Sequence, residues 1–198
     1  NVGSLDHWVA TCSSSGMEHI VVDGVSRGNA WAAKSFGYST CQMSINGYAG
    51  EPSDWEFAEL AIWDKALTDT QMKLVQDEML KKVLPNRVSN VPVASHRHIV
   101  DYDRISAVSA WGIYRAGDYN NGILKEARGN GRDARSTGDG VIDKKVEKAG
   151  NGAEANLEVL DGSEKSILSW PDGSIPTGGH TVCAISRYSG NHRGRILT

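Results

Sequence analysis

One segment constrains the fold of this chain more than any other, because it reads as a strand that runs almost directly into a capped helix. Residues 55–64, WEFAELAIWD, are apolar on both alternating faces, which is typical of a strand covered on both sides. Thr68 and Gln71 have the spacing of a capping box, so a helix is expected over 69–84. The apolar residues of that helix recur at helical spacing, at Met72, Val75, Met79 and Val83.

The remainder of the chain predicts strands and turns. Residues 7–12 and 18–24 are two short apolar runs joined by SSSG, the pattern of a β-hairpin. Gly, Asn and Asp separate the further short runs, which lie at 39–47, 106–119, 155–162, 166–170 and 180–190. Strands at such close spacing favour an all-β sandwich or barrel.

Composition excludes two classes of partner. The net charge of -3 over 198 residues leaves no basic footprint for nucleic acid. No apolar run approaches the length that spans a bilayer, so membrane insertion is not expected. The 3 cysteines are too few for a disulfide scaffold, which leaves one disulfide or none.

Several motifs resemble those of concanavalin A-like, laminin-G-like domains. They include a tryptophan-bearing hairpin that ends in VDG and a strand that leads through IWD into the helix. The matching segments are 6–24, 57–72, 111–134, 157–162 and 181–197. This resemblance implies an all-β fold, an antiparallel jelly-roll β-sandwich with one short helix at 69–84.

The order of these motifs is reversed relative to that family. Residues 1–84 resemble the closing half of a sandwich, 85–105 a linker, and 106–198 the opening half. The chain therefore resembles one period of a tandem-repeat surface protein, or a circularly permuted domain. Each half would expose the apolar face of an incomplete core, so it needs a complementary half to cover that face. We expect the halves to close on each other within one chain, and exchange with neighbouring copies is the alternative.

The resemblance and the motif order together predict a function. We expect a non-catalytic structural repeat of an extracellular surface protein or filament, whose partners are copies of itself or neighbouring repeats. The alternative is a carbohydrate-binding, lectin-like module that recognises glycans. No cofactor is expected. Asp118, Asn120 and Asn121 resemble an oxygen-rich calcium loop only loosely, and turn chemistry explains these residues equally well.

Aromatic residues in loop-like surroundings are the candidates for ligand or interface contact. Trp31 and Trp170 lie in such surroundings, and Tyr188, on the predicted strand at 180–190, is a further candidate. Cys12 and Cys41 lie on runs that could be neighbours, so they form the candidate disulfide, with two buried free thiols as the alternative.

Two sets of polar residues raise the question of catalysis or metal binding. Glu56 and Glu59 are three residues apart in a predicted strand, which places them on opposite faces and argues against a paired-carboxylate hydrolase. His96 and His98, with Asp101 and Asp103 close behind, match no zinc-motif spacing. A solvated polar loop is expected there, and no metal site.

Overall fold

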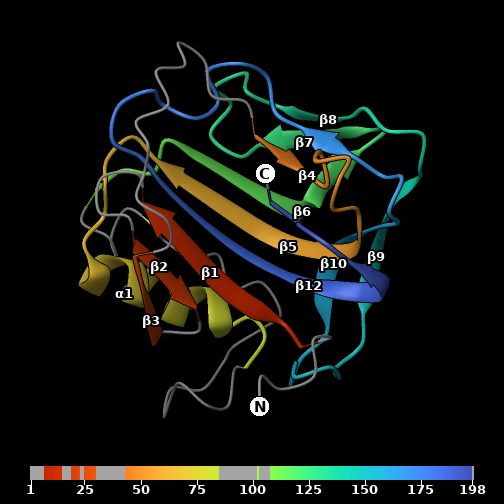
Figure 1. Cartoon of the computed structure of the whole chain (residues 1–198), viewed down its shortest axis with the longest axis horizontal. Coiled ribbons are helices and arrows are strands. Elements are labelled where there is room, and N and C mark those ends of the chain that lie inside the picture. The colour runs from red at the N-terminus through yellow and green to blue at the C-terminus, as the bar shows by residue number, and fades with distance from the viewer. Residues whose placement is uncertain are drawn as a thin grey trace.

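The protein is a single antiparallel sheet with one short helix packed against it (Figure 1). The computed structural model describes residues 7–14, 19–22, 25–29, 43–84, 102 and 108–197. The strands in these ranges are β1 (Val9–Ser14), β2 (His19–Val22), β3 (Val25–Asn29), β4 (Ser44–Ile45), β5 (Ser53–Trp63), β6 (Gly112–Asn120), β7 (Ile123–Glu126), β8 (Ala134–Ser136), β9 (Ile142–Glu147), β10 (Leu157–Gly162), β11 (Leu168–Ser169) and β12 (Thr181–Arg193). The predicted β-rich class with one short helix is confirmed.

The sheet interleaves strands from the two ends of the sequence. Its order is β3-β2-β1-β12-β5-β6-β7-β8-β11-β4, with β10 pairing β5 and β9 beside it. Strand β12 therefore lies between β1 and β5, and its Cys183 faces Cys12 on one side and Ala61 on the other. Strands β1 and β5 therefore pair with β12 and β6 from the other half of the sequence within one chain.

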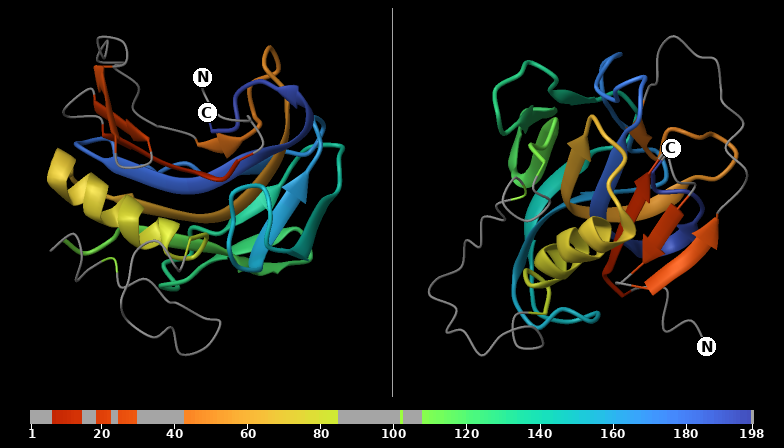
Figure 2. Two further views of the ribbon diagram at one scale, coloured as in Figure 1. Left: turned by 90° about the horizontal axis from the view of Figure 1, so that it is seen from below. Right: turned by 90° about the vertical axis from the view of Figure 1, so that its left-hand side faces the viewer.

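Strand β5 is the centre of this sheet, and a β-bulge changes its alternation. One edge of β5 pairs with β12 along most of its length; the other pairs with β6 near Glu59 and with β10 near Phe57. The register with β12 moves from Ile185↔Glu59 to Ser186↔Phe57, so Ala58 is the extra residue. A bulge bends its strand, and β5 and β12 indeed curl along their length into a half-barrel (Figure 2).

Each face of the sheet carries its own apolar core. On one face, Trp63 and Ile185 pack with the helix and with Tyr102. On the other face, within the curl, Trp55 and Trp170 pack among the short strands. Coverage of β5 on both faces explains why its residues are buried at nearly every position.

Helix α1 (Asp69–Leu80) begins as predicted but ends earlier than the expected Leu84. Thr68 and Gln71 form the capping box, and the predicted apolar stripe is buried. After Leu80 the backbone tightens, because the amides of Lys82 and Val83 donate to carbonyls three residues earlier, as in a 3₁₀ turn.

The disulfide joins Cys12 to Cys183, so the expected Cys12–Cys41 bond is wrong. Cys12 and Cys183 are directly opposite on the paired strands β1 and β12, with a Cα–Cα distance of 4.1 Å. Directly opposite residues of an antiparallel pair approach most closely at non-hydrogen-bonded positions. Cys41 lies outside the described residues.

Candidate functional site

One face of β5 carries a row of carboxylates that runs from the rim of the sheet to its interior. Asp54 and Glu56 share this face by strand alternation. The bulge at Ala58 brings Glu59 onto it as well, because an extra residue shifts the alternation by one. The prediction that Glu56 and Glu59 point to opposite faces is therefore wrong.

Glu56 is fully buried and lies in an ion-pair network. Its Oε2 accepts a hydrogen bond from Arg187 Nε at 2.6 Å, and its Oε1 lies 2.8 Å from Lys145 Nζ. Arg187 also contacts Glu147, and Lys145 also contacts Asp161. Burial opposes the charge on Lys145, yet hydrogen bonds to the carboxylates of Glu56 and Asp161 outweigh it and raise the pKa of Lys145.

Glu59 is equally buried and has its own set of partners. Tyr102 donates its hydroxyl to Glu59 Oε1 at 2.7 Å, and Arg115 Nε lies 3.5 Å from the same oxygen. Lys82 Nζ contacts the other oxygen, Oε2. Burial, with a smaller contribution from the positive charge of Arg115, lowers the pKa of Lys82 to about 7.

The geometry of these interior carboxylates does not suit hydrolysis. A paired-carboxylate mechanism needs both groups to reach a sugar and one of them to transfer a proton. Here the side chains of Glu56 and Glu59 are each about 1% exposed and their oxygens face Arg and Lys side chains. Their arrangement instead resembles a buried ion-pair network that fixes one packing of the sheet.

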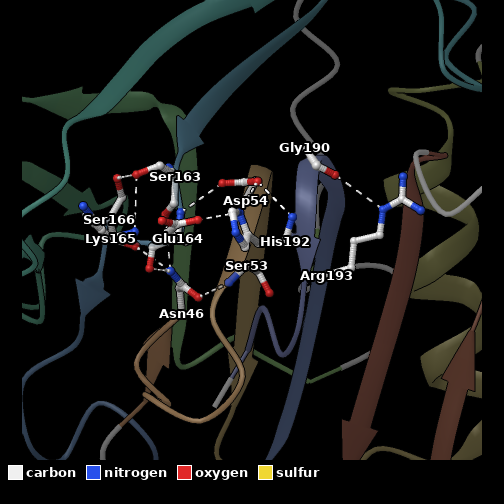
Figure 3. Close-up of polar contacts among 10 residues, drawn as sticks. All are labelled: Asn46, Ser53, Asp54, Ser163, Glu164, Lys165, Ser166, Gly190, His192 and Arg193. Atoms are coloured by element: carbon white, nitrogen blue, oxygen red, sulfur yellow. Dashed lines mark hydrogen bonds and ion pairs between the residues drawn. The ribbon is translucent and has the colours of Figure 1, made fainter.

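The rim end of the row forms a second cluster, built from three separate segments (Figure 3). Asp54 comes from β5, Glu164 from the turn between β10 and β11, and His192 from the end of β12. One ligand-type atom from each of the three lies within 4.8 Å of the others. The side chains are 20%, 33% and 53% exposed, in that order, so the cluster is open to solvent.

Asp54 is the centre of this rim cluster. Its Oδ2 lies 3.0 Å from His192 Nδ1 and accepts the His192 backbone amide at 3.0 Å, while its Oδ1 accepts the Glu164 amide at 3.1 Å. Partial burial opposes ionisation, but these hydrogen bonds prevail and lower the pKa of Asp54. Glu164 Oε2 also contacts His192 Nδ1, so both carboxylates converge on one nitrogen.

A buried asparagine holds the turn that carries Glu164. Asn46 adopts a positive φ of 59°, and its amide group donates to the carbonyls of Glu164 at 2.9 Å and Ser166 at 3.2 Å. Its Oδ1 accepts the Ser53 amide at 2.6 Å, next to Asp54. Asn46 therefore joins the backbone segments that carry Asp54 and Glu164 (Figure 3).

The approach of β12 to Asp54 requires a glycine. A Cβ added at Gly190 would lie 2.4 Å from Asp54 Oδ2. No real Cβ comes that close to an oxygen, so a larger residue at 190 would displace either the carboxylate or the β12 backbone that carries His192.

Two of the three aromatic candidates from the sequence, Trp170 and Tyr188, lie among the described residues. Trp170 is 1% exposed and packs edge-on against Tyr114, so it lies in the core and not in a ligand-binding loop. Tyr188 is partly buried and donates its hydroxyl to the Gly194 carbonyl at 2.6 Å. Trp31 lies outside the described residues.

The other polar candidates are turn residues or fall outside the described ranges. Asn121 and Gly122 have φ values of 49° and 78°, which suit a tight turn between β6 and β7 and support the turn interpretation. Asp118 and Asn120 lie exposed on β6 beside that turn. Four residues lie outside the described ranges: His96, His98, Asp101 and Asp103.

A shallow depression of about 390 Å³ lies beside the start of β6, away from both carboxylate clusters. Asp64, Lys65 and Trp111 contribute to its lining. The guanidinium of Arg132 lies 4.0 Å over the Trp111 ring, so that face of the ring is already covered. Sugar stacking on the same face would require Arg132 to move.

The rim cluster was not found from the sequence. Asp54 and Glu164 are 110 residues apart, and Asp54 and His192 are 138 apart. No short motif links three such segments, and only the pairing of β5 with β10 and β12 brings them together.

Comparison with known proteins gives no match: none of the family models, curated proteins or solved structures matches this chain. Within the part of the chain that the structure describes, no helix has the length and apolar character needed to cross a bilayer.

Proposed function

We propose that this chain is a non-catalytic structural module of an extracellular surface protein or filament, and that it works through contacts with copies of itself or with neighbouring repeats. The observation that carries the proposal is the interleaving of β1, β12, β5 and β6, which joins the closing-type and opening-type segments in one sheet. A single repeat of a tandem array, or a permuted domain, needs such pairing to complete its core and be stable.

The fold belongs to the same proposal. We take the curled sheet as a variant of the laminin-G-like jelly-roll sandwich, in which the helix and the short strands close the two cores. The interstrand disulfide supports an extracellular or cell-surface location, because disulfides persist in oxidising compartments and are rare in the cytosol.

The ion pairs of the interior support a role without catalysis. Glu56 and Glu59, the carboxylates that a hydrolase would use, are buried against Arg187, Lys145 and Arg115. Carbohydrate binding is the second proposal and has weaker support, since Trp170 is buried and Arg132 covers Trp111.

Sedimentation velocity and negative-stain electron microscopy of the oxidised chain test the structural role. The proposal expects assemblies that grow with protein concentration and no hits on a glycan array. A monomer at every concentration that binds defined glycans would overturn the structural proposal in favour of the lectin-like one.

The variant Glu59→Gln, which removes the charge of Glu59, tests the non-catalytic role separately. If wild type hydrolysed a polysaccharide and this variant did not, the non-catalytic role would be contradicted.

A further inference from the structure

We propose that Asp54, Glu164 and His192 form a binding site for a divalent transition-metal ion of the zinc type, at the rim of the sheet where β5, β12 and the β10–β11 turn meet. The proposal does not depend on how copies of the chain contact one another. It begins with the donor set, which is one imidazole nitrogen and two carboxylate oxygens.

The separations of the donor atoms suit a single ion. Asp54 Oδ2 and His192 Nδ1 are 3.0 Å apart, and Glu164 Oε2 contacts the same nitrogen. Protein ligands bind Zn²⁺ through N or O atoms at about 2.0–2.2 Å. Two ligands of one tetrahedral ion must then lie roughly 3.4 Å apart. Asp54 Oδ2 and His192 Nδ1 are close to this separation, and Glu164 Oε2 needs only a small shift away from the nitrogen to bind the same ion.

The charge of the site favours a cation. Within the described part of the chain, no Lys or Arg side chain contacts Asp54 or Glu164, and His192 is their shared partner. One imidazole nitrogen holds at most one proton, which cannot lie on a straight line to both carboxylates. A divalent ion at the same position would neutralise both carboxylates and bind the nitrogen lone pair.

The ligands are held in place before an ion arrives. Asn46 fixes the turn of Glu164 to the start of β5, and backbone amides of Glu164 and His192 orient the Asp54 carboxylate. Such supporting hydrogen bonds are what metal sites use to orient their ligands. The close approach at Gly190 keeps β12 within reach of the carboxylate.

The nitrogen donor selects the class of metal. Ca²⁺ and Mg²⁺ prefer oxygen ligands alone, whereas imidazole with carboxylates suits Zn²⁺ and its first-row neighbours. Three protein ligands leave a fourth position open, and the exposure of His192 places that position in solvent.

Isothermal titration calorimetry of the chelator-treated full chain with ZnCl₂ tests the site. Wild type is expected to bind one Zn²⁺ per chain, and CaCl₂ at the same concentration is expected to give no comparable heat. His192→Gln and Asp54→Asn are each expected to weaken Zn²⁺ binding at least about tenfold, since even loss of a supporting group costs about 10–100-fold. Circular dichroism in EDTA checks that both variants remain folded.

The matched control is the double variant His96→Gln/His98→Gln, which removes two histidines that are close together in the sequence and are not part of the proposed site. It is expected to bind Zn²⁺ as wild type does. Three results would overturn the site: no one-to-one binding by wild type, binding lost in the double variant but kept in His192→Gln, or binding of Ca²⁺ in preference to Zn²⁺.

Discussion

The two carboxylate clusters are built on the same face of β5, through Asp54 at the rim and through Glu56 and Glu59 in the interior, and they differ in how their charge is matched. In the interior, Glu56 and Glu59 are buried among Arg187, Lys145 and Arg115. At the rim, Asp54 and Glu164 share one histidine and face solvent. The interior carboxylates therefore contribute to the packing of the sheet, and the rim carboxylates remain accessible to a ligand from solvent.

The largest expected effect comes from breaking the interior network. Arg187→Met leaves Glu56 buried with Lys145 as its main partner, and loss of one member of a buried ion pair costs about 3–5 kcal/mol. Urea unfolding should show that loss. Glu51→Gln is the matched control, because Glu51 pairs with Arg195 on the exposed surface. Equal stability of the two variants would show that the buried ion pairs contribute no more to stability than an exposed pair does.

The second largest loss of stability is expected from removal of the Asn46 hydrogen bonds that support the rim cluster. Asn46→Ala removes a buried side chain that bonds Ser53, Glu164 and Ser166, and leaves their backbone groups unsatisfied. Ser53 and Ser166 are buried, and each buried unsatisfied group costs about 1–3 kcal/mol, so a loss of at least about 2 kcal/mol is expected from urea unfolding. A loss below that of Glu51→Gln would show that these hydrogen bonds do not support the rim cluster.

The interior cluster should also give a pH dependence of stability. The folded pKa of Lys82 is about 7, whereas an unfolded lysine has a pKa of about 10.4. Between these values the unfolded chain holds more protons, so the free energy of unfolding should rise with pH, by at most about 1.4 kcal/mol per unit. Lys82→Met should flatten the curve between pH 7 and 10. An unchanged slope in this variant would assign the effect elsewhere.

The smallest effect is expected at the rim itself. Glu164→Gln, measured in the presence of a chelator, removes one charge from an open cluster, and exposed ion pairs contribute only about 0.2–1 kcal/mol. Thermal unfolding should place this variant close to wild type. If Glu164→Gln destabilised the chain as much as Arg187→Met, the rim would be a structural ion pair like the interior one.

Local features of the fold could be predicted from the sequence, because they depend on neighbouring residues. The capping box at Thr68 and Gln71, the hairpin β1–β2 and the turn at Asn121–Gly122 all have short-range chemical causes. The double-sided burial of β5 was visible in its apolar run.

Features that depend on strand pairing could not be predicted in this way. The bulge at Ala58 exists only against β12, and it reversed the expected orientation of Glu59 relative to Glu56. The partner of Cys12 followed from the position of β12 beside β1. Strand β9 lies at an edge and carries Asp143, Lys144 and Lys145, so its alternation was hidden among charges.

The place of β12 between β1 and β5 has a consequence for synthesis. Sequence positions 12 and 183 are separated by 171 residues, yet their strands are neighbours at the middle of the sheet. A ribosome releases β1 and β5 before β12, so these two strands lack their shared neighbour until residues 181–193 have emerged. Non-local pairing of this kind slows folding, and Cys12 and Cys183 can form their disulfide in the native topology only after β12 has docked beside β1.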